Sequence, residues 1–84
     1  MLVAMPTVLR TQGYRFFFFS LESREPPHIH VERAEQYAKV WLESLTIAQS
    51  KGFRSGELSE IIRIVRENRL SFLEQWDEHF KRQI

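Results

Sequence analysis

The apolar residues in the first half of the chain follow the short period of β-strands. Four segments rich in aromatic and β-branched residues are separated by polar or glycine-containing connections, and they are Thr7–Arg10, Tyr14–Phe19, His28–Arg33 and Tyr37–Leu42. The short connections predict antiparallel hairpins, with Gly13 supplying a positive φ in the first turn. Leu45–Gln49 also alternates and suits a short edge strand, although a single helical turn fits it nearly as well.

The segment Tyr14–Phe19 is almost entirely aromatic and includes four consecutive phenylalanines. Because its apolar side chains do not alternate with polar ones, the pattern predicts a strand buried on both faces. The alternative is an exposed aromatic surface that contacts a partner or a nucleobase.

From Ser55 onward the period changes to that of an amphipathic helix. Apolar residues recur at intervals of three and four, and they are Leu58, Ile61, Ile62, Val65, Phe72, Leu73, Trp76 and Phe80. The pattern predicts one helix from Ser55 to Phe80, about 26 residues and roughly 39 Å long. The fold class is therefore α+β: a small, mostly antiparallel sheet of four to five strands followed by one long C-terminal amphipathic helix.

A helix of this length extends beyond the area that so small a sheet can cover. Its far end carries Phe72, Trp76 and Phe80. We expect these three side chains to form a partner interface, because exposed apolar surface of this kind marks interaction sites.

The residues best suited to catalysis or metal binding lie between Glu25 and Glu32. This stretch reads Glu-Pro-Pro-His-Ile-His-Val-Glu. The two prolines favour extended backbone, so a strand is expected to follow them. In a strand, alternate residues share a face, which places His28, His30 and Glu32 together. These three residues are the candidate catalytic set.

Three interpretations of this polar face stay open. His28 and His30 could bind a metal ion with a carboxylate as third ligand, but this is the weakest interpretation, and no metal or cofactor is expected. The two imidazoles could instead act as base and acid on a phosphodiester. The favoured interpretation is that the face contacts neighbours such as Tyr37 and Lys39, or binds a partner.

Composition narrows the range of functions. The chain has 84 residues, the size of one small domain, and contains no cysteine, which excludes disulfides and thiolate chemistry. Arg63, Arg66 and Arg69 are spaced by three and could form a basic ridge on the helix. Nucleic-acid binding is nevertheless not favoured, because the net charge is only +1 and interleaved glutamates can pair with these arginines.

The N-terminal residues carry no basic segment followed by a long apolar run, so they do not resemble a signal peptide. Residues 1–4 are expected to be an optional extension, because Met5 could serve as a second start. No apolar run approaches the roughly 18 residues of a membrane span, and we expect a cytoplasmic protein.

Several stretches taken together resemble one small bacterial family. They are Met5–Arg10, Gly13–Phe18, the Glu-Pro-Pro-His-Ile-His-Val stretch at 25–31, Ala38–Leu42, Gly52 with Phe53, and a closing helix with Glu67, Asn68 and Trp76. On these motifs the chain is identified, from Met5 to Phe80, as a member of the family catalogued as domain of unknown function 4160. The resemblance implies a short cytoplasmic protein encoded beside another small protein, in pairs that look like toxin–antitoxin modules. It implies no activity, cofactor or catalytic residue.

The sequence and the resemblance together predict a protein-interaction component of a toxin–antitoxin-like pair. Its expected partner is a small protein encoded nearby, a second copy of the chain, or both. The alternative is a small RNA-cleaving toxin that uses His28 and His30, so whether the chain is an enzyme is left open.

Overall fold

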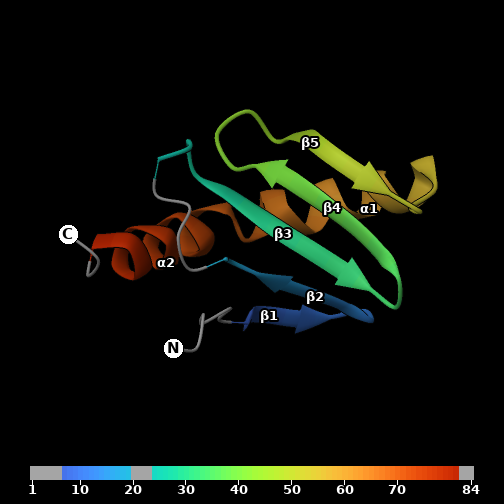
Figure 1. Ribbon diagram of the computed structural model, residues 1–84, viewed down its shortest axis with the longest axis horizontal. Coiled ribbons are helices and arrows are strands. Elements are labelled where there is room, and N and C mark those ends of the chain that lie inside the picture. Colours follow the sequence, from blue (N-terminus) through green and yellow to red (C-terminus); the bar gives the residue numbers. More distant parts are fainter. Residues whose placement is uncertain (1–6, 20–23, 82–84) are drawn as a thin grey trace.

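The computed structural model describes residues 7–19 and 24–81, and it has an α+β architecture (Figure 1). Five antiparallel strands pair in chain order, and they are β1 (Thr7–Thr11), β2 (Tyr14–Phe17), β3 (His28–Arg33), β4 (Gln36–Trp41) and β5 (Thr46–Lys51). Two helices, α1 (Ser55–Glu67) and α2 (Arg69–Lys81), cover one face of this sheet. The predicted α+β class, the antiparallel sheet and the strand character of the fifth segment are confirmed. Residues 1–4, predicted to be an optional extension, lie outside the described residues.

Local sequence explains the tight connections of this meander. Gln12 and Gly13 have φ values of 53° and 85°, the pair of positive angles found in type I′ hairpin turns. The next hairpin places Ala34 at φ 54°, a conformation that costs a residue with a Cβ roughly 1–2 kcal/mol. The turn from β3 to β4 is therefore strained at one position, and a substitution can test this.

Strand register divides the side chains between two faces of the sheet. Phe16 lies opposite Val31, and Val31 lies opposite Ala38, so these three share the face that packs against the helices. The next residue along each strand points to the other face, where no helix lies (Figure 1). Phe16 and Phe18 are buried on the helix side and Phe17 on the opposite side, which confirms that the aromatic segment is buried on both faces.

The prediction of one long C-terminal helix is wrong, because the helix breaks at Asn68. This residue has φ −111° and ψ 12°, away from helical values, and its side-chain amide donates to the Ile64 carbonyl at 2.8 Å. Asparagine competes with the backbone for hydrogen bonds and so tends to end helices. The Asn68 carbonyl still accepts the Phe72 N–H at 2.9 Å, so α2 begins at once.

The break also changes the position of the apolar helix end. Phe72, Trp76 and Phe80 are all buried within the chain's own core. The Trp76 ring centroid lies 5.5 Å from that of Phe18 and 4.1 Å from that of Phe80, at the end of the sheet where β3 begins. The expectation of a partner interface at these residues rested on an uncovered helix end, and the structure covers it.

Candidate functional site

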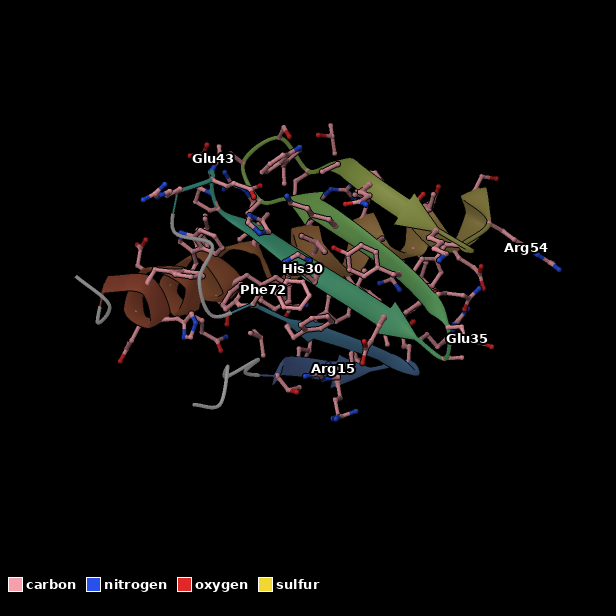
Figure 2. All side chains as sticks on the ribbon, in the orientation of Figure 1. Arg15, His30, Glu35, Glu43, Arg54 and Phe72 are labelled. Carbon is pink, nitrogen blue, oxygen red and sulfur yellow. The ribbon has the colours of Figure 1, made fainter. Side chains whose placement is uncertain are left out.

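The candidate site is the helix-free face of the sheet around β3, called here the outer face. His28, His30 and Glu32 lie opposite Trp41, Lys39 and Tyr37 of β4, respectively. His30 also lies opposite Phe17 of β2, and in Figure 2 it sits near the centre of the sheet. The alternation predicted for this strand is therefore present, with Ile29 and Val31 in the core behind it.

His30 is buried among aromatic rings despite lying on the face without helices. Its side chain is 2% exposed, and its ring centroid lies 4.2 Å from Phe19, 5.4 Å from Phe17 and 5.7 Å from Tyr37. Its Nδ1 and the Tyr37 hydroxyl are 2.6 Å apart, a short hydrogen bond. This imidazole is thus held by a fixed partner inside an aromatic cluster.

His28 is fully buried, at 0% exposure, where the sheet meets α2. Its Nδ1 lies 2.9 Å from the Pro26 carbonyl, and because a carbonyl can only accept, this nitrogen carries the proton. The ring lies 5.6 Å from Trp41 and 4.9 Å from Trp76, measured between centroids. His28 therefore connects the start of β3 to both β4 and α2.

The Glu-Pro-Pro-His motif folds onto its own neighbourhood. The Pro26 carbonyl accepts from His28, the Pro27 carbonyl accepts the Leu42 N–H at 3.0 Å, and Glu25 pairs with Lys39 at 2.5 Å. Since proline has no backbone N–H, its carbonyl is its only backbone hydrogen-bonding group, and both are used. The motif thus has a complete structural explanation as the anchor of β3.

Two stacks of ring, cation and carboxylate flank the histidines. The Arg15 guanidinium lies 4.3 Å above the Phe17 ring and pairs with Glu32, while Lys39 Nζ lies 4.8 Å from the Trp41 ring and pairs with Glu25. The two cationic side chains are 18% and 14% exposed, whereas both carboxylates are 43% exposed. The outermost charges of both stacks are therefore negative.

This geometry offers little to a metal ion. Glu32, the carboxylate expected to act as third ligand, is in an ion pair with Arg15 at 2.9 Å. Within residues 7–19 and 24–81, no group of three or more His, Asp or Glu side chains is arranged to hold a metal. Both imidazoles are engaged and buried, so the arrangement favours a structural role over proton transfer to a substrate.

The predicted basic ridge is divided by the fold. Arg63 pairs with Glu67 at 3.1 Å, and Arg69 Nε donates to the Leu42 carbonyl at 2.7 Å. Arg66 is exposed and has no ion pair among the described residues. One arginine of the three thus remains available to a ligand.

A second polar cluster fastens α1 to β2 and β3. Arg33 pairs with Glu57, and the Tyr14 hydroxyl donates to Glu60 at 2.8 Å. Burial, followed by the hydrogen bond to Glu60, raises the pKa of Tyr14 above its ordinary value. The Arg54 backbone N–H donates to Glu57 at 2.8 Å and lowers the pKa of that carboxyl. Arg54 is the N-cap of α1, which begins at Ser55.

Sequence reasoning missed an open groove of about 290 Å³ between β5 and α1, called here the β5–α1 groove. Its lining residues are Ile47, Leu58, Ser59, Ile62 and Arg66. The sequence signal for the groove was the apolar period of the helix, in which Leu58 and Ile62 form a stripe on one side. The period does not show which part of this stripe the sheet leaves uncovered, because that depends on the register of the strands.

The fold and the site define a small α+β protein with an antiparallel meander, a two-helix layer and a buried histidine–aromatic cluster. The family model described as Domain of unknown function (DUF4160) matches residues 13–77, which is most of the chain. The chain therefore belongs to the DUF4160 family, as its motifs predicted. No curated protein and no solved structure matched it. In the described part of the chain, neither helix has the length and apolar character needed to cross a membrane.

Proposed function

We propose that this chain is a cytoplasmic protein-interaction component of a two-protein module of the toxin–antitoxin type. The observation that carries the proposal is the β5–α1 groove, where half-buried Ile47, Leu58 and Ile62 line an open surface beside the last strand of the sheet. Apolar surface next to an unpaired strand edge is a common docking site for other proteins.

The open shape of the groove supports a protein ligand over a cofactor. Small-molecule sites are concave and bury most of the surface of the ligand, whereas this groove of about 290 Å³ is open to solvent. It is lined by three aliphatic side chains, one serine and one arginine, which suits side chains presented by another polypeptide.

The rival function, an RNA-cleaving toxin that uses His28 and His30, has less support. Both rings are buried, and a general base or acid must come within about 3 Å of the proton that it transfers. The most exposed charges around them are the carboxylates of Glu25 and Glu32, which repel the phosphates of RNA.

The decisive experiment is size-exclusion chromatography with light scattering on the full chain, alone and mixed with the product of the adjacent gene. We expect co-elution as a complex of defined mass. A monomer whose elution the neighbouring protein leaves unchanged would contradict the proposal.

A second measurement separates the two functions. We expect that the purified chain leaves RNA intact and that its expression alone does not arrest growth through RNA breakdown. If RNA is cleaved, and Tyr37→Phe abolishes the cleavage while the circular dichroism spectrum is unchanged, the enzymatic function replaces the one proposed here. Tyr37→Phe is sharper than alanine variants of His28 and His30, because it removes one oxygen and leaves the buried rings in place.

A further inference from the structure

The β5–α1 groove follows the apolar stripe of α1 where the stripe lies beside the edge strand of the sheet. Leu58, Ile62 and Arg66 follow one another at intervals of four on α1, so about 6 Å separates each from the next. In an extended chain, alternate side chains are separated by about 6.6–6.8 Å. The spacing of the helical stripe thus matches the side-chain repeat of a strand.

The edge strand β5 contributes the Ile47 side chain to the same groove. Gln49 lies opposite Lys39, but Ile47 lies opposite Val40, because the register shifts between these pairs. A bulge of this kind changes which way a side chain points. Without the extra residue, Ile47 would share the outer face with Gln49; with it, Ile47 lines the groove beside Leu58 and Ile62.

Charge at the groove indicates what kind of ligand would occupy it. Arg66 lines the groove, and Lys51 ends the edge strand. Neither has an ion pair within the part of the chain that the structure describes, and both are exposed. A second copy of this chain would bring cationic edges together, whereas an acidic ligand would neutralise them.

We infer that the β5–α1 groove binds an extended, apolar–acidic segment of the partner protein. Alternate apolar side chains of the segment contact Ile47, Leu58 and Ile62, and a carboxylate two residues further on pairs with Arg66. Outward backbone groups of β5 can hydrogen-bond to the segment, as in strand addition. The inference rests on the proposed function and specifies its surface and the chemistry of its ligand.

The test uses the full chain and two ligands, the product of the adjacent gene and a blocked peptide, Thr-Val-Thr-Val-Thr-Glu-Thr, whose two valines and glutamate share one side. With either ligand, amide hydrogen exchange within Thr46–Lys51 is expected to slow at least tenfold. Arg66→Glu is expected to weaken binding of either ligand at least tenfold. A peptide with lysine in place of glutamate should recover binding to Arg66→Glu.

Arg54→Glu is the matched control, because it makes the same charge change on an arginine that points away from the molecule at the start of α1 (Figure 2). It is expected to alter affinity less than twofold. Leu70→Asp is the apolar control, since Leu70 is 75% exposed and does not line the groove.

The outcomes separate this inference from the proposed function. If the neighbouring protein binds but β5 exchange and the Arg66→Glu affinity are unchanged, the groove is not the interface and only the inference fails. If the neighbouring protein does not bind, the proposed function fails, and the peptide result alone decides whether the groove accepts such a segment. Slowed β5 exchange that depends only on the concentration of the chain itself would assign the groove to a second copy and overturn the inference.

Discussion

The hydrogen bond between His30 and Tyr37 allows the structural role of the outer face to be measured. Tyr37→Phe removes the hydroxyl that lies 2.6 Å from Nδ1 of His30. Because His30 is only 2% exposed, water cannot readily replace this partner, and an unsatisfied buried group costs about 1–3 kcal/mol. We expect the free energy of unfolding to fall by that amount, with a drop in Tm of about 4–8 °C per kcal/mol for a domain of this size.

A double-mutant cycle isolates the hydrogen bond from the packing of the rings. His30→Phe alone leaves the half-buried Tyr37 hydroxyl, which can reach water, so its cost should be the smaller one. In the double variant both polar groups are gone and two phenyl rings replace stacked rings whose centroids are 5.7 Å apart. Replacing both partners by apolar groups can be nearly neutral, so the expected coupling energy is about 1–2 kcal/mol.

The assay is urea unfolding followed by the fluorescence of Trp41 in β4 and Trp76 in α2, which report on the sheet and on the helix layer. The dependence of the free energy on urea concentration should be the same in all four proteins, since each folds to the same state. A coupling energy within about 0.3–0.5 kcal/mol of zero, the limit of ordinary additivity, would refute the claim that this hydrogen bond secures the outer face.

Three further predictions follow from other positions. Ala34→Gly should raise the free energy of unfolding by roughly 0.5–1 kcal/mol, because glycine adopts φ 54° without the cost that a Cβ imposes. The greater freedom of glycine in the unfolded chain offsets only part of this gain. An unchanged or lower urea midpoint would contradict the prediction. In the same assay, Trp76→Ala should lower the free energy of unfolding by about 3–5 kcal/mol, because Trp76 is buried. Asp77 is exposed, so Asp77→Ala should change the free energy of unfolding by less than about 0.5 kcal/mol. Equal effects would show that α2 is not anchored by its aromatic residues. The pKa of Tyr14 is raised in the folded chain, so the stability that this group contributes is present below its unfolded pKa of 10.0 and is lost as pH rises through its folded pKa. Ultraviolet titration should find one tyrosine that ionises at higher pH than a free tyrosine. Glu60→Gln should make this tyrosine ionise at lower pH than in the unchanged protein.

Much of the fold could be predicted from local patterns. The strands β3 and β4 alternate strictly, and their connection is too short for anything but a hairpin, so both the elements and their pairing follow from the sequence. The helix break at Asn68 could not be predicted from the period, because both helices bury the same side of the chain and the apolar repeat passes through the break. The available signal was the asparagine itself, whose side chain competes for the Ile64 carbonyl.

The candidate site was predicted only in part, for a different physical reason. Alternation places His28 and His30 on one face, but it cannot predict whether that face is covered. Phe17, Phe19 and Tyr37 cover His30, whereas Trp41 and Trp76 cover His28. All of these residues lie on other segments, and four consecutive phenylalanines give no clue to their own register. Burial of the imidazoles is thus a tertiary property, as is the uncovered part of the α1 stripe.

The two stacks of ring, cation and carboxylate have a consequence for the behaviour of the chain in concentrated solution. A sheet face with Phe17 and Trp41 would ordinarily favour self-association through its rings. Here a cation covers each ring, and the carboxylates of Glu32 and Glu25 lie outside the cations, so two molecules that approach through this face meet like charge first. The aromatic surface is thereby protected by electrostatic repulsion, a colloidal protection that added salt weakens because it screens exposed charges.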